Sequence, residues 1–296
     1  MSLKTIAECK KLGIDLLSDF SPSPALDVSC FLRFILNCDN TYLLLHHKDF
    51  LSPEQEVQYF SFLENRKTGR PVAYITGKKE FYGFDFAVSP DVLIPKPDTE
   101  ILVEHAISAI SKTKKEKIRV CDMCTGSGCI GISVAKNTPE KIEFTLADIS
   151  RDALQIAKKN AATIAPEKNI KFLESNLFQN FNAQDKFDFI LTNPPYIPSN
   201  LVEKLLCDGR SEPRLALDGD VNPASNSSEK NDGLGIIRNL IPEMKKHMNQ
   251  GGIFFMETGE YNAEEASKIA EENGFCEIEI LKDLEGQLRV VKGSLL

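Results

Sequence analysis

The chain has 296 residues, a formal net charge of -8 and a pI of about 5.2. This acidic balance argues against a protein whose affinity comes from coating nucleic-acid phosphates with Lys and Arg. Hydrophobic residues at 42% and charged residues at 26% exclude a mostly disordered chain, and the length favours two domains over one.

The first 75 residues are predicted to form a compact domain of short helices. Apolar side chains recur there at helical spacing in Ile6, Leu12, Leu16, Phe31, Leu32, Ile35 and Leu36. Ser52 with Pro53 and, three positions after the serine, Gln55 forms the pattern of a capped helix start. The pair His46 and His47 is predicted to end a helix and not to bind a ligand.

Residues 76–97 change in character and are predicted to form a hairpin hinge. Phe81, Phe84, Phe86 and Val88 lie among glycines and prolines, as in two short strands joined by a turn. We expect these phenylalanines to pack in the core or the hinge; contact with a substrate is the lesser alternative.

Residues 98–296 alternate between strand and helix patterns. Short apolar runs suited to buried strands cover residues 117–121, 143–147, 187–192 and 253–257. An amphipathic stretch from Ser150 to Ile164 follows the second run, with Ser150 as its N-cap. This alternation predicts a Rossmann-like α/β fold with an open, mainly parallel sheet. The polar stretch from Gly219 to Asp232 breaks the order and is predicted to be a mobile surface loop.

A glycine-rich turn connects the first of these strands to a helix. Gly126, Gly128 and Gly131 spell G-x-G-x-x-G, which lets the backbone approach a ligand in front of free helix N–H groups. Asp148 ends the next strand, where its carboxylate can accept both hydroxyls of a ribose. NAD and S-adenosylmethionine both fit, and a turn that only packs is the bland alternative. Asp122 favours S-adenosylmethionine, because a carboxylate repels pyrophosphate and attracts sulfonium and ammonium charges.

The four residues Asn193, Pro194, Pro195 and Tyr196 follow a strand directly, at the edge of the sheet where ligands bind. An amide nitrogen is a poor nucleophile, because its lone pair is delocalised and no ordinary side-chain base deprotonates it. The Asn193 side-chain oxygen and the Pro194 carbonyl can each accept one N–H, next to the cofactor, while Tyr196 covers the planar group. These residues predict methyl transfer to an amide or amine nitrogen; a stiff turn without chemistry is the alternative.

Both turns together resemble the class I S-adenosylmethionine-dependent methyltransferases that modify planar amino groups, a set that includes DNA adenine, ribosomal RNA guanine and protein glutamine enzymes. The chain further resembles the HemK/PrmC family of release factor glutamine methyltransferases in residues 70–77, 81–83, 92–100, 212–219 and 289–291. The resemblance implies a helical domain over 1–75 that helps to hold the release factor and a methyltransferase domain over 98–296. The substrate it implies is the glutamine of a Gly-Gly-Gln motif.

The resemblance also implies roles for single residues. The amino-acid and ribose portions of S-adenosylmethionine would contact Cys124, Thr125, Gly126, Ser127 and Gly128. Asp148 would hold the ribose, and Asn176 with Leu177 would hold the adenine. Asn176 stands where the family usually has aspartate, and Lys96 stands where it usually has arginine.

Other functions remain open at this point. A nicotinamide-dependent oxidoreductase would use the same glycine turn but leaves Asn193 to Tyr196 unexplained. A noncatalytic module would bind a nucleoside or a factor. The runner-up is a nucleic-acid amino methyltransferase acting on DNA adenine or ribosomal RNA guanine, which the acidic total disfavours. We expect S-adenosylmethionine as cofactor, a release factor as partner, no stable nucleic-acid or membrane binding, and a monomer.

The eight cysteines are scattered, so we expect reduced thiols and no disulfide scaffold. Cys121 and Cys124 form C-x-x-C, but neither a second pair nor a histidine lies nearby in the sequence, so no metal site is expected. The N-terminus lacks the apolar run of a signal peptide, which predicts a cytoplasmic protein. The run KTKKEK at residues 112–117 is predicted to be a solvated loop and not a contact to RNA.

Overall fold

The structure is a computed structural model that describes residues 3–207, 212–221 and 230–296. The chain divides into two compact units, Met1–Lys78 with Leu205–Ser211, and Lys79–Lys204 with Glu212–Leu296. Over the described ranges, every helix is too short or too polar to cross a membrane. Residues 222–229, which make up most of the stretch predicted to be a mobile loop, lie outside the described residues.

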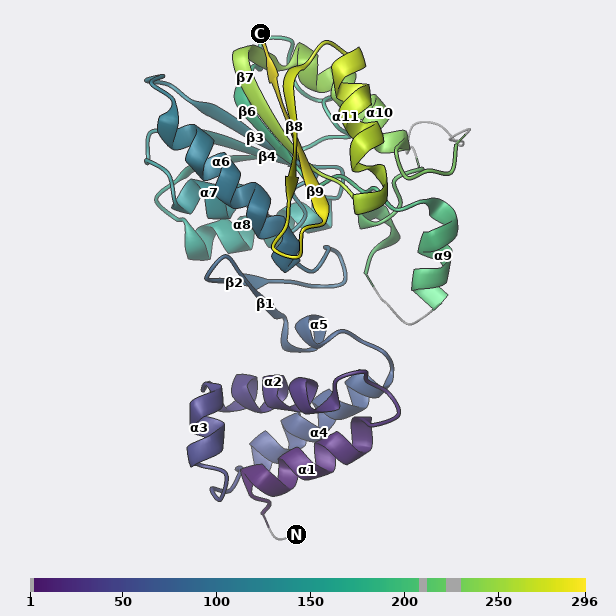
Figure 1. Ribbon diagram of the computed structural model, residues 1–296. Helices are drawn as coiled ribbons and strands as arrows, with labels where there is room; N and C mark the ends of the chain where they lie inside the picture. Colours follow the sequence, from purple (N-terminus) through teal and green to yellow (C-terminus); the bar gives the residue numbers. More distant parts are fainter. Residues whose placement is uncertain (1–2, 208–211, 222–229) are drawn as a thin grey trace. The chain divides into compact units, whose positions relative to one another are not determined.

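The first unit is built from helices, as the periodicity of its sequence predicts (Figure 1). They are α1 (Ile6–Leu17), α2 (Pro24–Leu36), α3 (Asn40–Leu45), α4 (Pro53–Lys67) and α5 (Val72–Thr76). The capping box predicted at Ser52 starts α4, and His46 follows the last residue of α3, so both local predictions are confirmed. The helices enclose a core that includes Leu17, Phe31 and Tyr59.

The buried face of α1 differs from the one that its leucines suggest. Leu12 and Leu16 are 39% and 37% exposed, whereas Cys9 and Gly13 are buried. The cause is Tyr59 of α4, whose hydroxyl donates to the Cys9 carbonyl at 2.9 Å. A Cβ atom on Gly13 would lie 1.9 Å from this hydroxyl oxygen. Small residues therefore face α4, and Leu12 and Leu16 turn outward, whereas Leu17 at the end of the helix is buried.

The second unit contains a seven-stranded sheet with the order β5-β4-β3-β6-β7-β9-β8. Its strands are β3 (Arg119–Met123), β4 (Glu143–Asp148), β5 (Asn169–Glu174), β6 (Phe187–Thr192), β7 (Met248–Glu257), β8 (Cys276–Lys282) and β9 (Leu288–Leu295). The strands from β5 to β7 are parallel, and β9 is antiparallel to both of its neighbours. The apolar runs at residues 143–147, 187–192 and 253–257 lie within β4, β6 and β7, and the run at residues 117–121 overlaps β3. The predicted α/β class is therefore confirmed.

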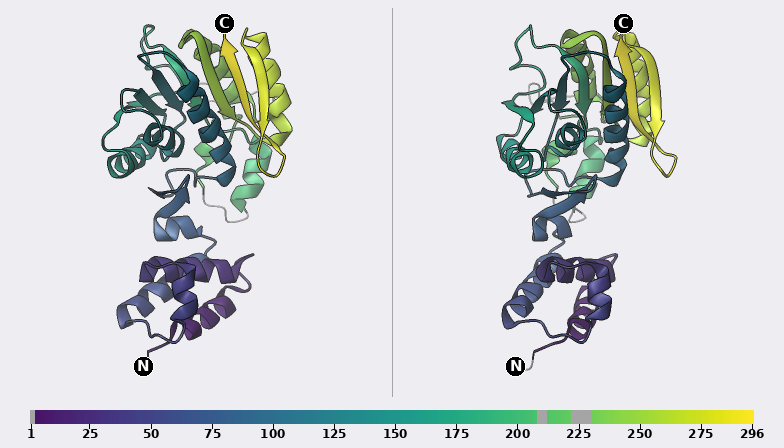
Figure 2. Two further views of the ribbon diagram at one scale, coloured as in Figure 1. Left: turned by 60° about the vertical axis from the view of Figure 1, so that its left-hand side comes forward. Right: turned by 90° about the vertical axis from the view of Figure 1, so that its left-hand side faces the viewer.

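Helices cover both faces of this sheet (Figure 2). The covering helices are α6 (Glu100–Lys112), α7 (Cys129–Lys136), α8 (Arg151–Ile164), α10 (Gly235–Lys246) and α11 (Ala263–Glu272). The chain also forms α9 (Ser199–Cys207) and the short turns η1 (Pro97–Thr99), η2 (Arg214–Ala216) and η3 (Glu260–Asn262). The residues of α6, α7 and α8 share one buried cluster with the sheet, and those of α10 and α11 share another. The predicted cap of α8 is confirmed, because the Ser150 side chain accepts from the Ala153 N–H.

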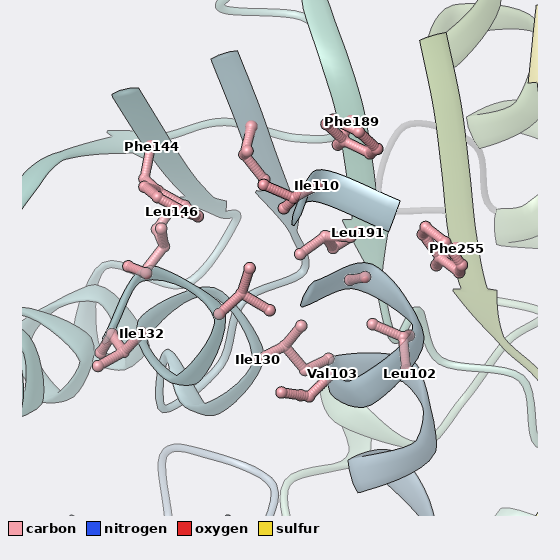
Figure 3. Close-up of a cluster of buried hydrophobic side chains, with 14 of the residues drawn as sticks. Leu102, Val103, Ile110, Ile130, Ile132, Phe144, Leu146, Phe189, Leu191 and Phe255 are labelled. Atoms are coloured by element: carbon pink, nitrogen blue, oxygen red, sulfur yellow. The ribbon is translucent and has the colours of Figure 1, made fainter. Parts of the chain in front are cut away.

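Close-packed apolar side chains fill the space between the sheet and α6 and α7 (Figure 3). Phe189 and Leu191 of β6 point into this layer, whereas Ile190 between them belongs to the cluster on the opposite face. Successive side chains of a strand alternate between faces, so a strand covered on both sides is apolar at most of its positions. This alternation explains why the central strands read as continuous apolar runs and not as alternating patterns.

A separate hairpin, β1 (Lys78–Phe81) and β2 (Phe84–Ala87), precedes the sheet in the chain. Phe81 and Phe86 are fully buried in the same cluster as α6 and α7, which confirms that this phenylalanine-rich stretch packs in the core. The Asn160 side chain of α8 accepts from the Ala87 N–H at 2.8 Å and donates to the Ala87 carbonyl at 3.0 Å. The hairpin therefore belongs structurally to the second unit.

Candidate active site

A cavity of about 280 Å³ lies at the carboxyl ends of the parallel strands of the second unit. Segments that follow four consecutive parallel strands contribute to it: residues 124–127 after β3, Asp148 to Ser150 at the end of β4, Ser175 to Leu177 after β5, and Asn193 with Pro195 after β6. Ligands bind at this edge in open α/β sheets. Most residues that the sequence suggested as a site are thus brought together at one cavity.

The glycine-rich turn after β3 forms the floor of the cavity. Gly126 and Gly128 have φ values of 55° and 82°, and Cys124, which is not a glycine, has a φ of 59°. The Thr125 N–H donates to the Ala147 carbonyl of β4 at 3.0 Å, and the Gly128 N–H donates to the Thr125 carbonyl at 2.8 Å. Left-handed conformations are needed to fold the backbone back at this point. Gly128 itself does not line the cavity, and its role is in the shape of the turn.

Asp122 departs from the role that the sequence suggested for it. Its side chain is fully buried and does not line the cavity, so it makes no direct contact with a ligand there. Its Oδ2 accepts from the Thr125 hydroxyl at 2.5 Å and from the Gly131 N–H at 2.9 Å. Burial raises the pKa of Asp122 to about 7, although these two hydrogen bonds act in the opposite direction. Asp122 therefore ties the glycine turn to the start of α7.

Asp148, unlike Asp122, lines the cavity. Its Oδ2 accepts from the Gly126 N–H at 2.8 Å and its Oδ1 accepts from the Ser150 N–H at 2.9 Å. Burial raises the pKa of Asp148, whereas the hydrogen bonds from backbone N–H groups lower it. Each carboxylate oxygen has two lone pairs, so both retain capacity for a further donor such as a ribose hydroxyl. Asn176 and Leu177 line the cavity from the turn after β5.

The turn from Asn193 to Tyr196 is divided between the cavity and the core. Asn193 and Pro195 line the cavity, but Pro194 and Tyr196 do not. Tyr196 packs against the apolar cluster beneath α10 and α11, and its hydroxyl donates to Glu257 Oε1 at 3.2 Å. The sequence suggested that the Tyr196 ring covers a planar group in the cavity, but a ring held in this way lies outside the cavity lining. Tyr196 instead anchors the turn.

The remaining wall of the cavity consists of segments to which sequence reasoning assigned no role. Three further prolines and five other apolar residues dominate it: Pro90, Val92, Leu93, Pro95, Pro213, Leu215, Ala216 and Ile236. Glu212 joins the two parts of this wall, because its Oε1 accepts from Lys96 Nζ at 2.8 Å and from the Ile94 N–H at 3.1 Å. The motif resemblance at residues 92–100 and 212–219 marked these segments, but nothing in the local sequence shows that they meet.

Two family models match the chain. Residues 9–77 match the PrmC N-terminal domain, and residues 97–211 match the Methyltransferase small domain. The chain is 37% identical over 275 residues to the release factor glutamine methyltransferase of Koribacter versatilis, covering 92% of each chain. It is also 37% identical over 267 residues to that of Clostridium acetobutylicum, covering 90% of this chain and 89% of the relative.

The chain belongs to the release factor glutamine methyltransferase family. A solved structure of the 16S rRNA N2 methyltransferase RsmC from Thermus thermophilus resembles the fold with a TM-score of 0.52 and 16% identity, covering 74% of this chain and 50% of the other. At this identity the likeness concerns the fold alone. The region of this family member that matches the methyltransferase model contains the glycine turn and Asn193. The wall formed by residues 90–95, 213–216 and Ile236 lies outside that region.

Among the residues that the structure describes, no group of three or more His, Cys, Asp or Glu side chains could hold a metal ion. Burial raises the pKa of the Cys129 thiol to about 12 and also raises the pKa of Cys124. Both thiols line the cavity as neutral, compact groups. Neutral thiols are weaker nucleophiles than thiolates.

Proposed function

We propose that this protein transfers a methyl group from S-adenosylmethionine to the side-chain amide nitrogen of the glutamine in the Gly-Gly-Gln motif of peptide chain release factors. The observation that carries the proposal is the position of Asn193, which follows β6 directly and lines the same cavity as the glycine turn and Asp148. The names of its relatives, which are similar over about nine tenths of the chain, support the substrate.

The residues of the cavity fit S-adenosylmethionine. When bound, this cofactor supplies a methyl group activated by a sulfonium. Asp148 is buried yet open to the cavity, which suits the two hydroxyls of a ribose. Gly126 leaves open space in the glycine turn, because no atom lies within 4 Å of the position that a Cβ would take there. Asn176 with Leu177 would border the adenine. The Asn176 amide oxygen can accept from the adenine amino group, without the charge assistance of an aspartate.

Positioning and hydrogen bonding would carry the chemistry. The Asn193 side-chain oxygen and the Pro194 carbonyl would each accept one N–H of the glutamine amide, which orients its lone pair toward the methyl group. The nitrogen becomes cationic and strongly acidic once it gains the methyl, so its proton leaves to water without a dedicated base. The proline-rich wall would limit the access of water and hold the acceptor in place.

We further propose that the helical unit helps to hold the release factor. Large apolar side chains are exposed on it, including Phe20, Leu44, Leu45 and Phe50, and are available for contact with a partner. The net charge of -8 supports a protein partner over a stable complex with nucleic acid. We expect the protein to act as a monomer in the cytoplasm, where translation termination takes place.

Parallel incubations with tritiated S-adenosylmethionine test the proposal. The acceptors are a purified release factor, the same factor with its Gly-Gly-Gln glutamine replaced by alanine, DNA and ribosomal RNA. Label is expected in the intact factor alone. Label in DNA or ribosomal RNA but not in the factor would replace the substrate by a nucleic-acid amino group. Tight binding of NADH without binding of S-adenosylmethionine, measured by calorimetry, would replace the reaction.

Asn193→Ala tests the mechanism. We expect kcat to fall by roughly 100-fold or more, because one of two acceptors that align the nitrogen is lost. The affinity for S-adenosylmethionine should change little, as measured by calorimetry. Asn200→Ala is the matched control, since Asn200 is an exposed asparagine of α9 that does not line the cavity. Unchanged methyl transfer in Asn193→Ala contradicts the mechanism, whatever the fold.

A further inference from the structure

The turn that presents Asn193 lacks the hydrogen bonds that stiffen regular structure. Pro194 and Pro195 have no N–H to donate, and their fixed φ does not determine where their carbonyls point. Beyond the prolines, the Ile197 N–H forms a backbone hydrogen bond, donating to the Leu217 carbonyl at 3.0 Å. The orientation of the turn therefore depends on how Tyr196, between the prolines and Ile197, is held.

The main chain of Tyr196 is held closely from two sides. Its carbonyl accepts from the Asn262 side chain at 3.0 Å and from the Tyr261 hydroxyl at 3.2 Å, both from η3. A Cβ atom on Gly233 would lie 2.1 Å from the same carbonyl oxygen. One on Gly219 would lie 2.8 Å from the Tyr196 Cα. The backbone at this residue has no room to rotate in these directions.

The side chain of Tyr196 is held by Glu257, at the end of β7. Parallel pairing places Thr192 of β6 opposite Met256, so Asn193 and Glu257 leave neighbouring strands at the same level. Glu257 is 1% exposed, and its Oε1 accepts from the Tyr196 hydroxyl at 3.2 Å. Its Oε2 has no hydrogen-bond partner among the described residues. A buried carboxyl is costly to maintain unless it contributes something that an apolar residue cannot.

We propose that Glu257 is a positioning residue for methyl transfer, which holds the Tyr196 hydroxyl and thereby fixes the positions of the acceptor atoms of Asn193 and Pro194. The inference rests on the proposed function, because it assigns a purpose to a contact outside the cavity. Glu257 touches neither the cofactor nor the glutamine amide. It acts through Tyr196, one strand away from the reacting atoms.

The useful property of Glu257 is its oxygen atom and not its charge. Burial raises the pKa of this carboxyl to about 7, and the nearby Arg289 guanidinium lowers it. The Arg289 charge is already shared with Asp283 at 2.9 Å and with Asp98 at 3.3 Å. A neutral carboxyl and a primary amide both keep a carbonyl oxygen that accepts a hydrogen bond. Glu257→Gln should therefore preserve the contact with Tyr196.

The test is the kinetics of Glu257→Gln and Glu257→Leu in the full-length protein, with a release factor as substrate. Glu257→Leu is expected to lower kcat by roughly 10- to 100-fold, because small displacements of aligned groups have effects of this size. Glu257→Gln should retain kcat within about threefold of the wild type, which is under 1 kcal/mol. The KM for the release factor and the Kd for S-adenosylmethionine should stay within about threefold in both variants.

A double-mutant cycle distinguishes positioning through Tyr196 from a general structural role. Tyr196→Phe removes only the hydroxyl that Glu257 holds. If Glu257→Leu unfolds at a much lower temperature than the wild type, the kinetics of Tyr196→Phe alone test the same contact. The double variant Tyr196→Phe with Glu257→Leu should be no slower than the slower single variant, because both remove one contact. The inference would be overturned if the losses of kcat in the two single variants multiplied in the double variant. A kcat of Glu257→Leu equal to that of the wild type would also overturn it. A wild-type protein that labels no release factor would instead overturn the proposed function.

Discussion

The two turns that meet at the cavity are stiffened in different ways. The glycine turn after β3 is held by groups close to it in the chain: Gly126 and Gly128 take left-handed conformations, and Asp122 accepts from groups three and nine residues further along. Ala147 and Asp148 of the next strand accept from the N–H groups of Thr125 and Gly126. The turn from Asn193 to Tyr196 is held from outside, by Glu257 and Asn262, which are more than sixty residues away in sequence.

This difference matches the tasks of the two turns. A cofactor site needs open space and backbone groups, which glycines provide by lacking side chains. An acceptor site for a weak nucleophile needs two oxygen atoms in fixed positions, and a proline-rich turn leaves its carbonyls without competing N–H groups nearby. Damage to the first turn should therefore appear in cofactor affinity, and damage to the second in kcat.

Gly233→Ala should have the largest effect and should act on the acceptor turn. The new Cβ would lie 2.1 Å from the Tyr196 carbonyl oxygen, at a residue with a φ of 74°. Overpacking and a left-handed conformation together should cost about 3 to 5 kcal/mol of unfolding free energy, measured by denaturant titration. The folded fraction should show a reduced kcat with nearly unchanged affinity for S-adenosylmethionine.

Gly286→Ala is the matched control for this variant. Gly286 has a φ of 86°, and no atom lies within 4 Å of the position that its Cβ would take. Its cost should be only the conformational one, about 1 to 2 kcal/mol. Equal losses in both variants would show that the close approach to Tyr196 does not hold the acceptor turn.

Gly131→Ala should act on the cofactor turn, with a smaller effect. Its Cβ would lie 2.8 Å from Asp122 Oδ2 and 2.9 Å from Leu146 Cδ1 in the sheet. We expect a loss of about 1 to 3 kcal/mol in stability. The Kd for S-adenosylmethionine should rise roughly tenfold, or about 1.4 kcal/mol, while kcat at saturating cofactor stays close to that of the wild type. A fall in kcat with an unchanged Kd would remove the distinction between the turns.

Ser133→Ala is the matched control, at a buried position of the same helix. This variant should leave both the free energy of unfolding and the Kd for S-adenosylmethionine nearly unchanged.

Asp122→Asn should change how stability depends on pH. The pKa of Asp122 is raised from 3.8 to about 7 in the folded protein, so the folded state holds a proton that the unfolded chain has released. The stability from this proton is present below pH 4 and is lost as pH rises through 7. Between pH 6 and pH 8 the wild type should lose about 1 kcal/mol more than Asp122→Asn. Parallel unfolding curves at the two pH values for both proteins would contradict this linkage.

Lys96→Met should have the smallest effect. The Lys96 side chain is 42% exposed, so solvent screens its ion pair with Glu212. We therefore expect the free energy of unfolding to fall by less than about 1 kcal/mol, as measured by thermal unfolding. The Ile94 N–H would still hold Glu212 and with it the proline-rich wall. A loss of several kcal/mol would show that the ion pair, and not the backbone contact, joins the two parts of the wall. Lys67→Met in the helical unit is a control for removal of an exposed ion pair.

Much of the fold could be predicted from the sequence because its signals act over short distances. The apolar run at residues 187–192 coincides with β6, and Ser52 and Ser150 begin helices as their capping patterns indicate. The glycine turn and Asp148 lie at one cavity because successive parallel strands end at the same edge of a sheet. Residue type and spacing alone contain this information.

Only the tertiary structure decided where neighbouring side chains point. Asp122 turns into the protein and Tyr196 turns toward Glu257, although both lie within two residues of residues that line the cavity. The wall at Pro90 to Pro95 meets the one at Pro213 to Ala216 across more than one hundred residues of intervening chain. Backbone conformation is set by a few adjacent residues, whereas the direction of a side chain depends on which distant segment packs against it. The sequence by itself thus determined the strands, the turns and their chemistry, and packing determined which of their residues face the ligand.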